Sequence, residues 1–273
     1  MPEGDTVYRH ARALDRALVG RRLERAELRV PSLAAADLVG TTVLGNQTWG
    51  KHLLTRFDNG LTLHTHLRMD GTWTVIRPSR RPPRERGDRI RVLYGTEDGH
   101  TVLGERIPVI DLVRSSEEDR LIGHLGPDPL RPDWDAAVAA ERLAAEPDRA
   151  VVVALGDQRC LAGLGNFWVN EVCFLRGYSP WTPVGETDVT ATIRLAARAL
   201  RASVTVPGMY QVTTGNRRLG EHQWIYGRAD LPCRRCGTRV QVDPGTPNDP
   251  ERRRTWWCPH CQPGPGPDGS PAS

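Results

Sequence analysis

Two residues at the start of this 273-residue chain combine a nucleophile with an acid. Once Met1 is removed, Pro2 presents a free secondary amine, which can attack an electrophilic carbon such as a sugar C1′ and form an iminium cation. An α-amine has a pKa of about 8, so a useful fraction is neutral near physiological pH. The neighbouring Glu3 can donate a proton to a leaving group or ring oxygen. Proline and an acid also suit a helix N-terminus, so a purely structural interpretation stays open.

A single lysine is the second candidate for chemistry. Lys51 is the only lysine among 37 basic residues, all the others being arginine. A lysine amine can give up its proton near neutral pH when its surroundings perturb it, whereas the guanidinium of arginine cannot. Lys51 stands after a turn, at the start of an expected strand. It could meet a phosphate there and pass on a proton, or it could be a solvated charge at a hairpin tip.

Four of the six cysteines form two close pairs, Cys233-x-x-Cys236 and Cys258-x-x-Cys261, which lie 21 residues apart. This spacing is typical of a four-cysteine zinc ribbon, and it predicts one structural zinc ion. Four thiolates leave no coordination position open, so we do not expect this zinc to be catalytic.

Two further segments suggest phosphate binding. The Gly163-Leu164-Gly165-Asn166 segment ends one expected helix and begins another, where backbone amides and a helix N-terminus attract phosphate. A helix C-cap followed by a turn explains the same glycines, and Asn166 would be the natural cap. An arginine run that includes Arg253 leads into the second cysteine pair. It is either a solvated face or the tip of a β-hairpin that offers guanidinium groups to nucleic acid.

The composition limits the class of protein. Hydrophobic residues make up 38% of the chain and the formal net charge is +4, which permits a nucleic-acid partner. No apolar run approaches the roughly 20 residues of a membrane span, and the acidic start has no apolar segment after it. We therefore expect a soluble, cytoplasmic protein and neither an integral membrane protein nor a secreted one.

The periodicity of apolar residues predicts the elements that carry these groups. A helix is expected over 5–18, with Asp5 or Thr6 as its cap. Short strands are expected from about 23 to 113. After a Gly-Pro-Asp-Pro hinge at 126–129, helices are expected over 134–145, 148–157, 166–174 and 187–203. Residues 263–273 form a low-complexity segment that we expect to be disordered.

Six motifs in this order make the chain similar to a known family. They are Met-Pro-Glu-Gly at 1–4, Gly-Lys-His-Leu-Leu at 50–54, His-Leu-Arg-Met-Asp-Gly at 66–71, Leu-Gly-Pro-Asp at 125–128, Leu-Ala-Gly-Leu-Gly-Asn-x-x-x-x-Glu at 161–171 and Arg-x-Thr-x-x-Cys-Pro-x-Cys-Gln at 253–262. Over residues 1–262 the chain resembles the formamidopyrimidine-DNA glycosylase and endonuclease VIII family. It looks most like the actinobacterial endonuclease VIII branch.

The resemblance implies an α+β fold in several parts. A catalytic N-terminal two-sheet β-sandwich that begins with a helix would occupy 1–125. A helical DNA-binding domain with a helix–two-turn–helix motif would occupy 126–228, and a four-cysteine zinc finger 229–262. Residues 263–273 would remain as the tail.

The resemblance also implies catalytic roles at matching motif positions. Pro2 would be the Schiff-base nucleophile and Glu3 its proton donor. Lys51 would be the proton donor linked to β-elimination. Arg253, at the tip of the zinc hairpin, would bind phosphate and assist δ-elimination.

Further positions would contact DNA or support the site. Asn166 would bind the lesion phosphate, and Glu171 on the same helix would support it. Arg68 and Met69 occupy the loop that fills the gap left by an extruded base. His124 stands where endonuclease VIII can carry an arginine that contacts DNA, which is a departure from the family pattern.

The resulting prediction is a bifunctional DNA glycosylase and AP lyase that removes oxidised bases, with pyrimidines as the expected substrates. Excision of oxidised purines is the enzymatic alternative. The alternative from another class is a non-enzymatic zinc-ribbon protein that binds nucleic acid, in which Pro2 and Glu3 merely start a helix. We expect damaged DNA as the partner, no membrane association and a monomeric state.

Overall fold

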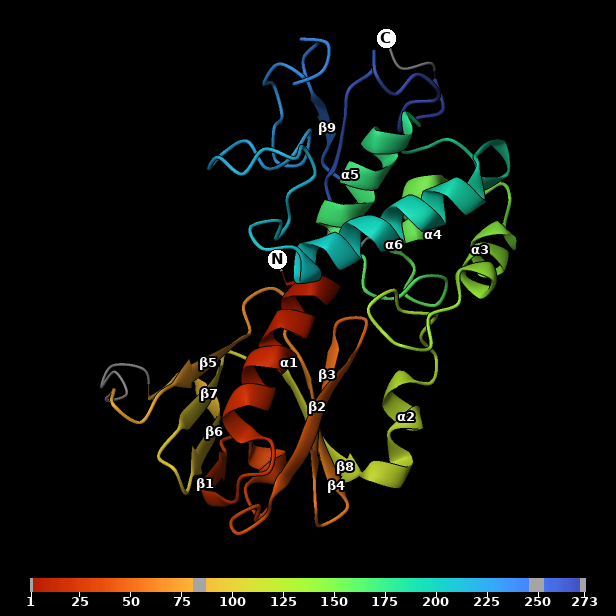
Figure 1. Ribbon diagram of the computed structural model, residues 1–273. Coiled ribbons are helices and arrows are strands. Elements are labelled where there is room, and N and C mark those ends of the chain that lie inside the picture. Colours follow the sequence, from red (N-terminus) through yellow and green to blue (C-terminus); the bar gives the residue numbers. More distant parts are fainter. Residues whose placement is uncertain (1, 81–86, 246–252, 271–273) are drawn as a thin grey trace. The chain divides into compact units, whose positions relative to one another are not determined.

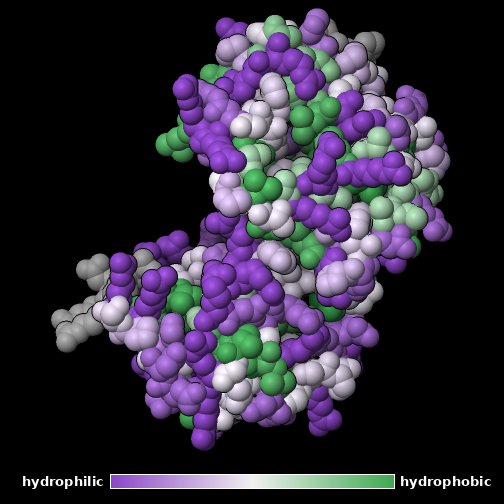
Figure 2. Space-filling view, in the orientation of Figure 1, coloured by the Kyte–Doolittle hydropathy of each residue, from purple (hydrophilic) through white to green (hydrophobic). Residues whose placement is uncertain are grey.

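The computed structural model describes residues 2–80, 87–245 and 253–270. The chain divides into two compact units, Met1–His124 and Leu125–Ser273, which are described separately below (Figure 1). On the face seen in Figure 2, hydrophilic residues cover most of both units, and hydrophobic residues show in small separate patches. Within the described ranges, no helix combines the length and the apolar character that crossing a membrane requires.

The first unit opens with the helix α1 (Gly4–Leu18), which confirms the helix predicted over 5–18. The four apolar residues that define its predicted face are all buried: Val7, Ala11, Leu14 and Leu18. This face packs against the strand β2. The predicted cap was wrong, because the helix begins two residues earlier than a cap at Asp5 allows. Glu3 is the N-cap, and its backbone N–H donates to Thr6 Oγ1 at 3.3 Å.

Two antiparallel four-stranded sheets follow, which confirms the predicted two-sheet arrangement. One sheet has the strand order β1 (Leu23–Leu28), β6 (Ile90–Thr96), β7 (Thr101–Glu105) and β5 (Thr72–Ile76). The other has the order β2 (Val43–Trp49), β3 (His52–Phe57), β4 (Leu61–His66) and β8 (Val109–Arg114). The short helices η1 (Pro31–Leu33), η3 (Ser115–Glu117) and α2 (Asp119–Ile122) complete this unit.

The larger apolar core of this unit lies between the two sheets and α1. Leu53 of β3 and Leu63 of β4 contribute to it from one sheet, and Trp73 and Tyr94 contribute from the other. Successive side chains of a strand point to opposite faces, so the residues next to Leu53 and Leu63 point away from this core. The sheet β2-β3-β4-β8 therefore has an outer face.

The second unit is helical at its centre. Its elements are α3 (Ala136–Ala144), α4 (Val151–Gly156), α5 (Asn166–Arg176), η4 (Val184–Glu186) and α6 (Val189–Thr205). The four longer helices lie where the sequence predicts them. Nine of the eleven residues of α5 are buried, so α5 is the central helix of this unit. The lone cysteines Cys160 and Cys173 belong to its core as small apolar residues.

A small hairpin packs on α5. Its strands, β9 (Gln241–Asp243) and β10 (Thr255–Trp257), are antiparallel. Phe174 of α5 shares a core with Trp256 of β10. The expectation of a disordered tail does not hold for residues 263–270, which form turns. There, Ser179 Oγ donates a hydrogen bond to the carbonyl of Pro265, and Gly266 is buried.

Candidate functional site

The N-terminus of the first unit places a buried carboxylate beside Pro2. Pro2 is half-buried and immediately precedes α1, and Glu3 is fully buried as the N-cap residue. The partial positive charge at a helix N-terminus stabilises a carboxylate in this position. The geometry suits a general acid next to an amine, and it also satisfies the requirements of a helix cap.

Lys51 lies at the tip of the β2–β3 hairpin. Trp49 and His52 are paired across the two strands, which leaves Gly50 and Lys51 as a two-residue turn. Gly50 has a φ of +57°, the value that a glycine supplies at the first position of a tight hairpin turn. The side chain of Lys51 is half-buried, so it is not the fully solvated charge that an incidental hairpin tip would carry.

The loop after β4 holds Met69 out into solvent. Met69 is 60% exposed, and Arg68 beside it is exposed with a φ of +48°. The backbone N–H of Arg68 donates to Nδ1 of His66 at 3.1 Å. A Cβ atom on Gly71 would lie 2.6 Å from the carbonyl oxygen of Leu67, so only glycine fits there. This tight loop presents a flexible apolar side chain of the kind that enters a gap between bases.

His124 belongs to a cluster of imidazoles in the first unit. The His52 ring centroid lies 5.0 Å from that of His64, 4.8 Å from that of His66 and 6.3 Å from that of His124. Burial, and to a lesser extent repulsion from Arg68 and from the neighbouring imidazoles when they are protonated, together lower the pKa of His52 to about 3. His52 is therefore neutral at physiological pH. Sequence reasoning missed His52 and His64.

Asn166 lies in the first turn of α5 and holds the hairpin strand β10. It is the first helical residue and not the cap, because Gly165 takes the N-cap position. Its Nδ2 donates to the carbonyl of Arg254 at 2.8 Å. One turn later, Asn170 Oδ1 accepts the backbone N–H of Trp256 at 2.7 Å. The two asparagines therefore join the start of α5 to the residues around Arg253.

Arg253 directly precedes this attachment point. Its side chain is exposed, and its Nη1 lies 3.6 Å from where a Cβ on Gly156 would stand. Whether Arg253 stands at the hairpin tip, as predicted, depends on residues 246–252, which lie outside the described residues. Asn166 binds the carbonyl of Arg254, and Arg253 is the residue before it. The hydrogen bond thus brings Asn166 and Arg253 to the same edge of the second unit.

Glu171 is fully buried in the middle of α5. Its carboxylate accepts the backbone N–H groups of Trp224, Ile225 and Tyr226, each at 2.9 Å, and a hydrogen bond from the hydroxyl of Thr213. Burial raises the pKa of Glu171, whereas these four donors oppose that shift. The carboxylate fixes the segment around 213–226 against the helix that carries Asn166.

The four predicted cysteine ligands converge. The sulfur atoms of Cys233, Cys236, Cys258 and Cys261 all lie within 4.8 Å of one another. Two sulfur–sulfur distances are 3.9 Å, between Cys233 and Cys261, and 3.5 Å, between Cys236 and Cys258. Zinc–sulfur bonds of about 2.3 Å in a tetrahedron require sulfurs roughly 3.8 Å apart. The donor set therefore fits a metal ion with closed tetrahedral coordination.

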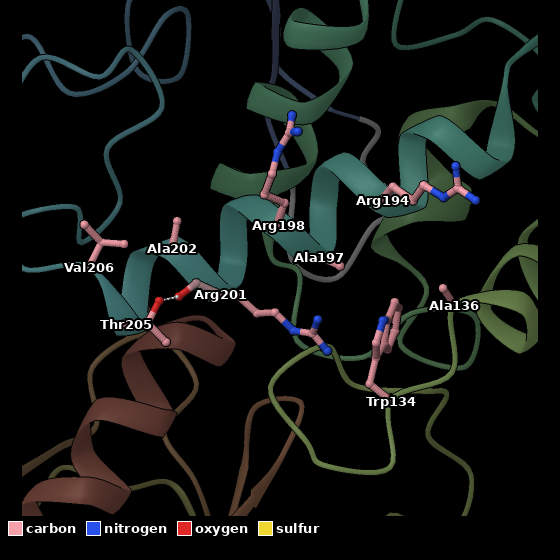
Figure 3. A pocket seen from close by; sticks show the side chains of 9 residues that line it. All are labelled: Trp134, Ala136, Arg194, Ala197, Arg198, Arg201, Ala202, Thr205 and Val206. Carbon is pink, nitrogen blue, oxygen red and sulfur yellow. Dashed lines mark hydrogen bonds between the residues drawn. The ribbon is translucent and has the colours of Figure 1, made fainter.

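A basic groove of about 430 Å³ lies along α6 (Figure 3). Arg194, Arg198 and Arg201 of α6 line it together with Trp134. Arg201 Nε donates to the carbonyl of Pro129 at 2.7 Å, and the guanidinium lies 5.9 Å from the centre of the Trp134 ring. None of the residues predicted from the sequence lines this groove.

The predicted residues thus fall into two groups, each inside one unit. Pro2, Glu3, Lys51, Arg68, Met69 and His124 belong to the first unit. Asn166, Glu171, Arg253 and the four cysteines belong to the second.

Comparison with known proteins finds relatives that cover nearly the whole chain. Residues 1–104 match the formamidopyrimidine-DNA glycosylase N-terminal domain. The chain is 50% identical over 271 residues to the probable endonuclease 8 2 of Streptomyces coelicolor, covering 98% of this chain and 96% of that protein. It is 40% identical over 262 residues to the DNA-(apurinic or apyrimidinic site) lyase Nei2 of Mycolicibacterium smegmatis, covering 96% and 99%.

Solved structures share the fold at lower identity. A complex of Lactococcus lactis Fpg (MutM) with DNA containing N7-benzyl-Fapy-dG has a TM-score of 0.76 and 22% identity to this chain. MutM in complex with DNA containing carbocyclic 8-oxo-G has a TM-score of 0.77 and 22% identity. Each comparison covers 96% of this chain and 99% of the other.

Proposed function

Because this chain belongs to the formamidopyrimidine-DNA glycosylase and endonuclease 8 family, we propose that it is a bifunctional DNA glycosylase and AP lyase that removes oxidised pyrimidines. The observation that carries the proposal is the 50% identity to an endonuclease 8 over 98% of the chain. The 40% identity to an apurinic or apyrimidinic site lyase over nearly its full length supports the lyase activity.

Pro2 and Glu3 supply the first chemical step. The neutral amine of Pro2 attacks C1′ of the damaged nucleotide, the bond from C1′ to the base breaks, and the base leaves with a proton. Glu3 is the proton donor, and its burial directly after Pro2 supports this role. The bond from C1′ to the ring oxygen O4′ then breaks, O4′ takes up a proton, and the nitrogen lone pair forms an iminium at C1′. This iminium acts as an electron sink, so a proton is lost from C2′ and the 3′ phosphate leaves. A second elimination releases the 5′ phosphate.

Lys51 provides the proton donor linked to β-elimination. Lys51 is half-buried at a tight hairpin turn, so its side chain has fewer accessible positions than a fully solvated lysine. This restriction supports the role, because it keeps the ammonium group in one place. A phosphate beside it would keep the ammonium charged until the proton is needed. Arginine, which does not release its proton near neutral pH, could not replace it in this step.

Asn166 and Arg253 clamp the DNA backbone around the lesion. The hydrogen bond from Asn166 to the carbonyl of Arg254 supports a shared role, because it ties the two residues to one edge of the second unit. Glu171 is a positioning residue for this edge, since it anchors the segment packed beside α5. Positioning of this kind holds the reacting atoms at the distance that chemistry requires.

Flipping of the damaged base gives roles to the exposed loop of the first unit. A base inside a duplex is out of reach of Pro2, so it must be extruded. The exposed side chain of Met69 fills the gap, and Arg68 and His124 contact the strand around it. The 60% exposure of Met69 in the absence of DNA supports this assignment.

Zinc is the metal that we assign to the four cysteines. Cys233, Cys236, Cys258 and Cys261 would hold one ion, which stabilises the hairpin that leads to Arg253. With four thiolates the ion supplies structure and no reactive position. We also propose that the second unit comprises a helical domain over 126–228 and a zinc finger over 229–262, after a catalytic domain over 1–125. The enzyme would act as a cytoplasmic monomer on damaged DNA.

Borohydride trapping tests the proposed function. The mature protein, with Met1 removed, should form a covalent adduct with DNA that carries an abasic site or an oxidised pyrimidine. N-terminal sequencing of the adduct should place the link at Pro2. A variant with a retained N-terminal tag serves as the matched control, because it keeps the DNA-binding surface and blocks the amine. Equal trapping by both proteins would contradict the mechanism, and binding without any trapping would favour the non-enzymatic alternative.

A panel of lesions tests the substrate class. Oligonucleotides with an oxidised pyrimidine, 8-oxoguanine or no lesion should be cleaved in that order of rate. Faster cleavage of the 8-oxoguanine strand would replace the pyrimidine assignment by excision of oxidised purines.

A further inference from the structure

Three polar side chains form a continuous hydrogen-bonded chain on the outer face of the sheet β2-β3-β4-β8. His64 of β4 lies directly opposite Asp111 of β8, and its Nδ1 is 3.0 Å from Asp111 Oδ2. The other ring nitrogen of His64, Nε2, is 2.8 Å from Nδ1 of His52 on β3. His64 is buried, whereas the side chain of Asp111 is 46% exposed. One end of the chain therefore reaches solvent at Asp111, and the other ends at His52.

The hydrogen bonds determine which ring nitrogens carry protons. A carboxylate only accepts, so His64 Nδ1 carries a proton and donates it to Asp111. The Nε2 atom of a neutral His64 then accepts, and His52 Nδ1 must donate to it. This leaves His52 Nε2 without a proton. Among the residues that the structure describes, no group is hydrogen-bonded to this nitrogen.

The groups around His52 disfavour a positive charge on its ring. His66 is paired with His52 across the strands, His124 follows α2, and Arg68 follows β4. Lys51 is the preceding residue in the hairpin turn. Asp111, which is hydrogen-bonded to His64, supplies the carboxylate of this hydrogen-bonded series. These charges disfavour a proton on His52 in the free protein, which agrees with the lowered pKa of that imidazole.

We propose that Asp111, His64 and His52 form a proton-carrying chain that takes up one proton from solvent when a DNA phosphate binds beside Lys51 on this face. The inference rests on the proposed function, because it needs a phosphodiester as the ligand. A bare Nε2 repels phosphate oxygen, whereas a protonated one donates to it. When Nε2 gains a proton, the Nδ1 proton passes to His64 Nε2. The positive charge then lies on His64, next to the Asp111 carboxylate, and His52 stays neutral with its N–H directed at the phosphate.

A metal site is the obvious alternative for clustered imidazoles, and the geometry is against it. Within the described parts of the protein, the four cysteines are the one group of three or more His, Cys, Asp or Glu side chains whose donor atoms converge closely enough to hold a metal ion. Asp111 is thus a positioning residue that acts through His64, and the expected ligand is a phosphodiester.

Nuclear magnetic resonance of the imidazole nitrogens tests the chain without DNA. Free wild-type protein near pH 7.5 should show His52 and His64 as neutral rings protonated at Nδ1. In Asp111→Asn the carboxylate charge is lost, and the preference of His64 for the Nδ1 proton should weaken. A His52 ring protonated at Nε2 in the wild type would overturn the proposal, whatever the protein does to DNA.

Proton uptake on binding tests the link to phosphate. The probe is a duplex with a tetrahydrofuran abasic-site analogue, titrated calorimetrically from pH 6 to 8.5 in buffers of different ionisation enthalpy. The wild type should gain up to about tenfold in affinity per unit fall in pH, which corresponds to uptake of one proton. Asp111→Asn should lose most of this slope. Asp98→Asn is the matched control, because Asp98 Oδ1 lies 2.9 Å from His100 Nδ1 in the turn between β6 and β7, and this variant should keep the slope.

Two binding results would refute the inference. A wild type without proton uptake would show that no proton enters the chain. An Asp111→Asn variant with weaker binding but an unchanged slope would show that Asp111 only stabilises the sheet. Failure of the proposed function itself looks different, because the borohydride adduct at Pro2 would then be missing while the imidazole spectra still report on the chain.

Discussion

Replacing Glu171 by glutamine should loosen the second unit by an amount that follows from its hydrogen bonds. The carboxylate accepts two backbone N–H groups on Oε1, from Ile225 and Tyr226. On Oε2 it accepts the N–H of Trp224 and the hydroxyl of Thr213. A glutamine oxygen can keep the first pair, but its NH₂ group then faces the N–H of Trp224.

One orphaned buried donor costs about 2 kcal/mol, so Glu171→Gln should be destabilised by about that amount. Glu171→Ala leaves all three N–H groups without an acceptor, so its free energy of unfolding should fall by about 4 kcal/mol. Glu186→Gln, at an exposed position of the helix η4, is the matched control and should stay within about 0.5 kcal/mol of wild type.

Hydrogen exchange resolved to peptides is the appropriate assay, because it reports the local opening free energy of one segment. Amide protection in the peptide that covers 213–226 should fall by roughly thirtyfold in Glu171→Gln, the equivalent of about 2 kcal/mol. Peptides of the two sheets in the first unit should exchange as in wild type. Unchanged protection of 213–226 in the glutamine variant would refute the assignment of this carboxylate as the anchor of the segment.

Four further outcomes are expected. Lys51→Arg should keep most of the DNA affinity and lose about a hundredfold in single-turnover rate on a damaged base, since general acid–base catalysis contributes about that much; an undiminished rate would show that only charge matters. Arg253→Ala should weaken binding to damaged and undamaged DNA alike and lower the log–log salt slope by about one, whereas a changed lesion preference at an unchanged slope would show that it reads the base. Removal of zinc by a chelator should abolish DNA binding before the first unit unfolds, as followed by circular dichroism and binding assays; metal-free protein of full affinity would contradict this. The pKa of His52 is about 3 in the folded protein, below its unfolded value, so the first unit should lose stability as the pH falls below about 6.5. In urea unfolding curves, His52→Asn should show a weaker dependence of stability on pH.

Several features of this protein could be predicted from the sequence because they depend on residues that are close together in it. The period of Val7, Ala11, Leu14 and Leu18 predicts a helix with one buried face, and the structure buries all four. The alternation and turn residues between 23 and 113 predict strands in the right places. Cysteine pairs with this spacing predict a cluster whose sulfurs the structure brings within 4.8 Å.

Other predictions failed at element boundaries and at the chain end. The cap of α1 is Glu3 because the helix begins two residues earlier than a cap at Asp5 allows, and Thr6 Oγ1 still satisfies a backbone N–H there. Asn166 is inside α5 because Gly165 takes the extended cap position. Residues 263–270 are held by Ser179, and composition alone does not reveal that contact.

By itself, the sequence determined the family, the residues with reactive groups and the periodic elements that carry them, since these depend on residue types and short spacings. Only the tertiary structure decided which distant groups meet. His52, His64 and Asp111 form one chain because the register of three strands aligns them. Glu171 finds its donors more than 40 residues away. Strand register and helix packing are fixed by burial of the whole core, and a local pattern does not encode them.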